Sequence, residues 1–125
     1  AQKILRAPDE ELSFDFWLQL RAPDAVLLSF DLEFNRALKS ADFSNNSIGD
    51  EGTAALSDAL TANSTLETLE LRSNEIGAAG AQSLAGMLQV NRALNSVDLR
   101  FNQIPGEGKQ QLRDAVKGKN TTLQL

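Results

Sequence analysis

The sequence lacks cysteine, histidine and tyrosine altogether, and these absences exclude several kinds of chemistry. Without cysteine or histidine the chain cannot form a disulfide, a thiolate nucleophile, a histidine-based catalytic triad or a zinc finger. Cysteine usage therefore gives no indication of the redox compartment. We expect no catalytic residue of these classes, no metal site and no cofactor.

Basic residues and long apolar runs are also scarce. The 12 Lys and Arg residues against 17 Asp and Glu residues give a formal net charge of −5. Because a nucleic-acid-binding protein needs clustered Lys and Arg to contact phosphates, we expect no nucleic-acid partner. No apolar run approaches the roughly 18 residues of a membrane span, and no charged-then-apolar leader opens the sequence. We therefore expect no membrane partner and a cytoplasmic location.

What the sequence does contain is a repeat. Three blocks begin at Leu38, Leu66 and Leu94, which are 28 residues apart, and we expect Leu123 to open a fourth block after one inserted residue. Each block has Leu at its first position, apolar residues at the fourth and sixth, Asn at the ninth, Ile at the eleventh and Gly at the fifteenth. Self-similarity at a fixed period of this length is typical of solenoid proteins.

Two hydrophobic periods within each block predict its local structure. The fourth and sixth positions alternate with polar residues, which is the pattern of a short strand. Farther on, apolar residues such as Leu56, Ala59 and Leu60 recur at i, i+3 and i+4, which is one face of a helix. Because a unit this small cannot bury its own apolar face, neighbouring blocks must stack. The sequence therefore predicts an α/β solenoid with parallel strands in one layer and helices in the other.

The recurring asparagines and glycines have predicted roles in this stack. Backbone groups lose their ladder partners where the chain turns out of each strand, and a buried Asn amide supplies both a donor and an acceptor. We therefore predict an asparagine ladder of Asn46, Asn74 and Asn102, with a plain turn marker as the alternative. The fifteenth-position glycine is expected at the junction of loop and helix, where little room or unusual dihedral angles favour it.

The shared pattern is L-x-x-[ALV]-x-[FL]-x-x-N-x-I-[GP]-x-x-G, followed by L-x-x-[AM]-[LV]. It resembles the leucine-rich repeat, and its length and helical second half are similar to the ribonuclease-inhibitor-like subclass, found also in NOD-like receptors and tropomodulin-type actin regulators. Two departures are Ala41, which is small for its position, and Pro105, which replaces the glycine of Gly49 and Gly77. The resemblance implies a curved protein-binding scaffold, a leucine-rich-repeat solenoid with strands on the concave side and helices on the convex side.

The repeats divide the chain into two predicted regions. Residues 38–125 hold three repeats of 28–29 residues and the start of a fourth, and residues 1–37 form an N-terminal cap with a degenerate half-repeat. Within this cap, residues 23–35 keep the apolar spacing of a helix. Because residue 1 is Ala and not Met, we expect a processed chain or a piece of a longer one.

Two alternatives remain open for residues 8–20. A Pro-led helix could begin near Pro8, because the sequence L-R-A-P-D occurs there and again before the predicted helix. Alternating apolar residues instead favour a strand, and a one-residue slip would bring Phe14 and Phe16 onto the strand ladder. In either case these two residues and Trp17 are predicted to form a bulky lid over the first rung, with a tryptophan binding hot spot as the alternative.

The candidate binding residues lie at the fifth, seventh and eighth positions of each block. Side chains there should point to or near one surface, which we call the concave strand face. They are Asp42, Ser44 and Asn45, then Glu70, Arg72 and Ser73, then Asp98, Arg100 and Phe101. Three of them form an acidic column and two an adjacent arginine column. Phe101 is the candidate anchor, because an aromatic residue stands where earlier blocks have polar residues.

These residues favour protein recognition over catalysis. A catalytic or metal role for the acidic column is disfavoured, because a shallow sheet offers no enclosed pocket and the arginines neutralise the carboxylates. The sequence therefore predicts a protein–protein interaction scaffold that is not an enzyme and uses the concave strand face. The alternative is a structural or assembly module that stacks through its open repeat ends, forming a homo-oligomer through the C-terminal end.

Overall fold

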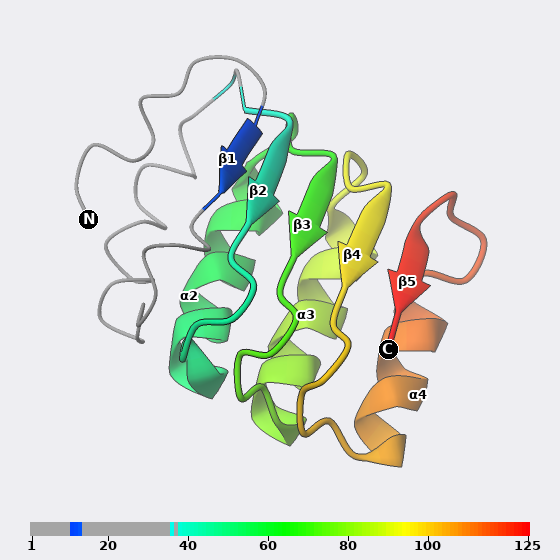
Figure 1. Cartoon of the computed structure of the whole chain (residues 1–125). Coiled ribbons are helices and arrows are strands. Elements are labelled where there is room, and N and C mark those ends of the chain that lie inside the picture. The colour runs from blue at the N-terminus through cyan, green and yellow to red at the C-terminus, as the bar shows by residue number, and fades with distance from the viewer. Residues whose placement is uncertain (1–10, 14–35, 37) are drawn as a thin grey trace.

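The computed structural model of the chain describes residues 11–13, 36 and 38–125. Its strands form one layer and its helices a second layer behind them (Figure 1). In chain order the elements are β1 (Glu11–Ser13), β2 (Ser40–Asp42), α2 (Gly49–Ala62), β3 (Thr68–Glu70), α3 (Ala78–Val90), β4 (Ser96–Asp98), α4 (Gly106–Ala115) and β5 (Thr122–Gln124). None of the helices in these ranges is long and apolar enough to cross a membrane.

The five strands form one parallel sheet in the order β1-β2-β3-β4-β5. Fourth-position residues of neighbouring blocks lie opposite one another, because Ala41 pairs with Leu69 and Leu69 with Val97. Each strand therefore follows its predecessor by one whole block. This arrangement confirms the predicted α/β solenoid.

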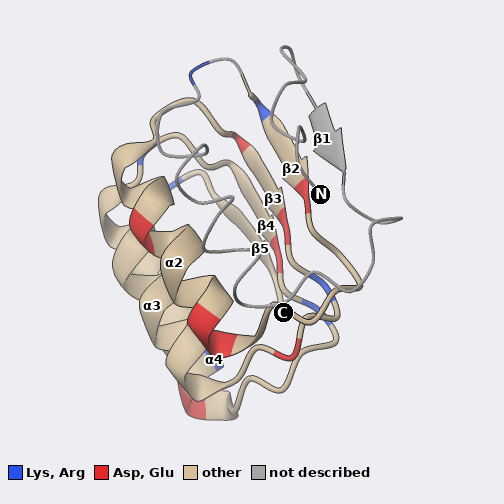
Figure 2. Cartoon of the chain, turned by 90° about the vertical axis from the view of Figure 1, so that its left-hand side faces the viewer, with Lys and Arg blue, Asp and Glu red and all other residues tan. Residues whose placement is uncertain are grey.

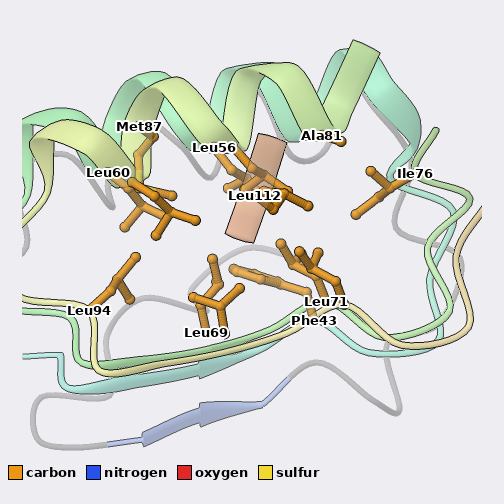
Figure 3. Close-up of a cluster of buried hydrophobic side chains, with 14 of the residues drawn as sticks. Phe43, Leu56, Leu60, Leu69, Leu71, Ile76, Ala81, Met87, Leu94 and Leu112 are labelled. Carbon is orange, nitrogen blue, oxygen red and sulfur yellow. The ribbon is translucent and has the colours of Figure 1, made fainter. Parts of the chain in front are cut away.

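The hydrophobic core lies between the two layers (Figure 3). Phe43 and Leu71, directly after their strands, meet Leu56 and Leu60 of α2, and all four are at most 1% exposed. The strand-side residues come from the alternating positions and the helix-side residues from the i, i+3, i+4 positions. The strand-side and helix-side apolar residues of one block thus pack against each other and against those of the neighbouring blocks.

Asparagine side chains tie each rung to the next. The Asn74 amide nitrogen donates to the backbone oxygens of Phe43 at 2.8 Å and Arg72 at 3.1 Å, and its oxygen accepts from the Ile48 N–H at 3.4 Å. On the next rung, the Asn102 side-chain oxygen accepts from the backbone N–H of Asn74 at 2.8 Å. Each amide therefore satisfies backbone groups of its own rung and of the preceding rung.

A second set of polar side chains joins the rungs where the helices end, and the sequence reasoning missed it. The Asn91 amide nitrogen donates to the backbone oxygens of Leu60 at 2.7 Å and Asn63 at 3.0 Å. One block later Lys119 takes the same place, and its ammonium group donates to the backbone oxygens of Leu88 and Asn91. The 28-residue spacing of Asn63 and Asn91 was the available signal.

The glycine at the fifteenth position is required by close packing and not by its dihedral angles. A Cβ atom at Gly80 would lie 2.7 Å from the Ile76 Cγ2 atom and 2.7 Å from an Asp50 carboxylate oxygen. That same oxygen accepts the backbone N–H groups of Gly77 at 2.7 Å and Gly80 at 3.0 Å. The first turn of α2 therefore caps the N-terminus of α3 from the neighbouring block.

Pro105 fits this arrangement although it departs from the repeat. It occupies the place of Gly77 in the next block, and Ala78 occupies the place of Asp50. Proline has no N–H group and alanine has no carboxylate. The acceptor of this cap and one of its two donors are therefore missing at the start of α4, where only the N–H group of Gly108 remains.

The predicted start of the fourth block at Leu123 is wrong. Leu123 lies opposite Val97, so it occupies the fourth position of its rung and not the first. The paired residues are 26 apart instead of 28, because α4 has 10 residues against 13 in α3 and the connection that follows α4 is one residue longer than the one after α3. Leu123 and Leu125 pack partly against the core, as the fourth- and sixth-position residues of the other rungs do.

A strand lies within residues 8–20, where the sequence left helix and strand open. Leu12 of β1 pairs with Ala41, 29 residues away, which is the one-residue slip expected for the strand alternative. The predicted lid of Phe14, Phe16 and Trp17 and the predicted helix at 23–35 lie outside the described residues.

Candidate functional site

Three carboxylates follow one another across the sheet on the concave strand face. The register places Asp42 of β2 opposite Glu70 of β3, and Glu70 opposite Asp98 of β4. Figure 2 shows acidic positions in red on the neighbouring strands of the sheet. Adjacent strands are about 4.8 Å apart, so each carboxylate lies in the field of the next.

Two arginines surround the last carboxylate of this column. Arg100 holds Asp98 with two parallel hydrogen bonds, from Nε at 3.0 Å and from Nη2 at 2.8 Å. The Arg72 Nε atom lies 3.5 Å from the same carboxylate. Burial alone would raise the pKa of Asp98, but the hydrogen bonds and charge of Arg100 outweigh burial and lower that pKa. Asp98 therefore holds the Arg100 guanidinium group with hydrogen bonds as an anion, and it attracts Arg72 by charge.

The middle carboxylate is shifted in the opposite direction. Burial raises the pKa of Glu70, and the negative charge of Asp42 raises it further. Asp98 also raises this pKa, while Arg72 and Arg100 lower it. The Arg72 Nη2 atom lies 3.9 Å from the Glu70 carboxylate, whereas the Arg72 Nε atom lies 3.5 Å from the Asp98 carboxylate. Glu70 is therefore under-compensated by positive charge.

The first carboxylate has no basic partner in the part of the chain that the structure describes. The Asp42 side chain accepts the backbone N–H of Ser44 at 2.9 Å, and it forms no ion pair with a described residue. Likewise, among residues 38–125, no group of three or more acidic side chains is placed to hold a metal ion.

The eighth position of every block has a left-handed backbone. The φ angles are 61° for Asn45, 55° for Ser73 and 60° for Phe101. Asparagine adopts this conformation readily, whereas for a bulky aromatic residue it is a genuine outlier. Phe101 is also 72% exposed. It therefore carries backbone strain without the burial that normally stabilises an aromatic side chain.

Ser44 departs from the predicted binding set, because it is only 1% exposed. It shares the seventh position with Arg72 and Arg100, whose longer side chains are 36% and 42% exposed. A serine side chain is too short to reach past its neighbours, so it does not contribute to the surface. Asp98, only 5% exposed, also lies below the surface, beneath the arginines it binds.

The sequence model of the leucine-rich repeat matches residues 34–57, 62–85 and 90–109, together more than half of the chain. The chain belongs to the leucine-rich repeat family. Its three matched leucine-rich repeats contain every residue of the predicted concave strand face, from Asp42 to Phe101. The candidate site is therefore built by the leucine-rich repeats themselves and by no inserted segment.

The leucine-rich repeats are similar in structure to a solved protein, "Leiomodin-1 Actin-Binding Site 2 (ABS2)". The TM-score is 0.82, the sequences are 23% identical, and the match covers 91% of this chain and 68% of that chain. At this identity the likeness shows a shared fold. No curated protein matches the sequence.

Proposed function

We propose that this chain is a protein-interaction scaffold that binds a partner protein on its concave strand face. In this proposal the chain is a non-enzymatic, cytoplasmic module of the ribonuclease-inhibitor-like subclass and uses no cofactor. The observation that supports it most directly is Phe101, an exposed aromatic residue on a left-handed backbone.

Stability alone does not explain Phe101. A left-handed backbone costs most residues roughly 1–2 kcal/mol, and asparagine, present at the equivalent Asn45, is among the exceptions. Because Phe101 is 72% exposed, burial of its side chain offsets little of this cost. Strained residues and exposed aromatic groups both concentrate at binding sites, where an aromatic anchor inserts into the partner.

The residues beside Phe101 are arranged to keep the surface rigid. Arg100 precedes Phe101 and is held by two hydrogen bonds to Asp98. A side chain already ordered in the free protein loses less conformational entropy when it meets a partner. Arg100 therefore offers an ordered, half-exposed guanidinium group next to the anchor.

The decisive variant is Phe101→Asn, which installs the residue of the first repeat. We expect it to raise the free energy of unfolding by roughly 1 kcal/mol, because asparagine tolerates the left-handed backbone. The same variant should lose the partners captured by the immobilised chain from a cytoplasmic extract. Glu75→Asn is the matched control, because Glu75 also has a left-handed backbone, with a φ angle of 61°, but is not one of the candidate binding residues, so this variant should keep the partners.

Stabilisation together with loss of partners would separate binding from folding. Unchanged partners in the Phe101→Asn variant would contradict the proposed use of the concave strand face. Actin is the first purified protein to test in this assay, because the structurally similar leiomodin segment is named as an actin-binding site. Binding of actin that ignores Phe101 would count against the concave strand face in the same way.

The second candidate function is self-association through the edge of β5. This strand lies at one end of the described sheet and pairs with β4 alone. An open strand edge is a template for another chain. Light scattering coupled to size exclusion tests this candidate. A mass that rises with concentration supports assembly, and a constant monomer mass excludes it.

A further inference from the structure

We propose that the partner segment is extended and carries a basic side chain over Asp42 and Glu70, followed or preceded by an apolar side chain on Phe101. This inference rests on the proposed function and names the chemistry of its partner. The two contact points are the under-compensated carboxylates at one side of the concave strand face and the aromatic anchor at the other.

Charge is unevenly distributed over the concave strand face. Both described arginines of the face are directed to Asp98, with Arg100 at 2.8 Å and Arg72 at 3.5 Å. Asp42 has no ion pair with a described residue, and Glu70 has only the 3.9 Å approach of Arg72. The face therefore keeps an excess of negative charge over β2 and β3, which a cation from a partner complements.

The surroundings of Glu70 disfavour its ionised carboxylate. Its pKa is raised by burial and by the charge of Asp42, which lies opposite it in the register, so the ionised form of Glu70 is disfavoured in the free protein. A basic side chain placed between them would favour the ionised form and remove the mutual repulsion. A second acidic group in the same place would add to the repulsion, which argues against an acidic segment at this part of the face.

The distance between the two contact points determines the spacing of the two side chains in the partner segment. Phe101 follows Asp98 by three residues, and Asp42 lies two strands away in the register. Strands about 4.8 Å apart, and residues at most about 3.3 Å apart beyond the end of β4, place Asp42 within roughly 14 Å of Phe101. An extended segment spans this distance in about four residues. The basic and apolar side chains of the partner should therefore be about four positions apart.

Synthetic peptides on the 125-residue chain test the inference. Each peptide carries one arginine and one leucine in a glycine–serine background, separated by one, three or five residues. Matched peptides carry glutamate in place of arginine. Binding is followed by titration of backbone amide signals in nuclear magnetic resonance spectra. We expect the three-residue separation to bind most tightly, with affinity about tenfold above the glutamate peptide.

Protein variants locate the binding site. We expect Asp42→Asn combined with Glu70→Gln to lower the affinity of the arginine peptide about tenfold. Asp58→Asn combined with Glu107→Gln is the matched control, because it makes the same change in net charge at exposed residues of α2 and α4. Phe101→Asn should weaken the peptide with the three-residue separation most, because that peptide reaches both contact points. Affinity should also fall as the pH is lowered through the pKa of Glu70, because protonation removes the charge of this carboxylate.

Several outcomes would overturn the inference. They are no shift of any amide signal with millimolar peptide, tighter binding of the glutamate peptides, or equal loss of affinity in the control variant. The proposed function fails separately. If a partner captured from extract needs Phe101 but ignores Asp42→Asn with Glu70→Gln, the scaffold stands and the basic segment is wrong.

Discussion

At the scale of single residues, Glu70 and Asp98 show how position within one column divides similar groups. They are opposite each other on neighbouring strands, yet the pKa of Glu70 is raised and that of Asp98 is lowered. Burial acts in the same direction on both groups. The difference arises because Arg100 donates hydrogen bonds to Asp98 and none to Glu70.

These opposite shifts predict opposite effects on stability. Because folding raises the pKa of Glu70, protonation favours the folded state, and this stabilisation is lost as the pH rises through the raised value. We expect Glu70→Gln to stabilise the chain at pH 7 by roughly 0.3 kcal/mol, a small effect since the side chain is 35% exposed. Below a pH of about 4 the advantage should vanish.

Asp98→Asn should behave in the reverse manner. The lowered pKa means that ionised Asp98 stabilises the folded state above its ordinary pKa, and this contribution is lost as the pH falls through the lowered value. The variant should therefore be less stable than the parent at pH 7 and approach it in acid. Urea unfolding at several pH values measures both variants, and effects of equal sign would contradict the electrostatic account.

The asparagine ladder gives a second prediction at this scale. Asn74 is fully buried, and its removal leaves the backbone oxygen of Phe43 without that donor. We expect Asn74→Ala to lower the free energy of unfolding by roughly 2–3 kcal/mol. Asn102→Ala should cost less, because its partly exposed site admits water. Equal costs in urea unfolding would show that burial of the amide is unimportant.

At the scale of elements, each helix is constrained by the block before it. At the start of α3, Gly80 packs closely against Asp50 and Ile76, whereas in the middle of α3 Gly86 faces open space. Both positions have ordinary helical surroundings in the sequence. The helix therefore contains one glycine that packing requires and one that it does not.

This contrast predicts two substitutions with opposite signs. Gly86→Ala should stabilise the chain by roughly 0.5–1 kcal/mol, because alanine has the higher helix propensity and nothing blocks its Cβ atom. Gly80→Ala should destabilise it, since the Cβ atom displaces the Asp50 carboxylate from the end of α3. Thermal unfolding of both variants checks the pair. Stabilisation by Gly80→Ala would contradict the close packing between blocks.

At the scale of the whole molecule, the 28-residue period was sufficient to predict which residues lie side by side. Ala41, Leu69 and Val97 are opposite one another because equal spacing carries equal positions to equal places in a stack. The prediction failed at Leu123, where the last block is two residues shorter because α4 is a shorter helix, and where the pattern L-Q-L marks a strand and not a block start. A period predicts register only while each block keeps its length.

The candidate site was predictable in its columns and not in its details. The acidic column follows from the period, but the burial of Ser44 depends on the lengths of surrounding side chains. The opposite pKa shifts of Glu70 and Asp98 depend on which carboxylate Arg100 reaches. The left-handed backbone at Phe101 arises from the turn that leads to the ladder, and the repeat pattern contains no marker for it.

Amide hydrogen–deuterium exchange of the chain with and without its captured partner tests the central claim most directly. We expect slower exchange in the bound state across residues 40–45, 68–73 and 96–101, which carry the concave strand face and Phe101. We expect no change on the outer faces of α2, α3 and α4. Protection confined to those helices, with unchanged exchange at 96–101, would contradict recognition through the concave strand face.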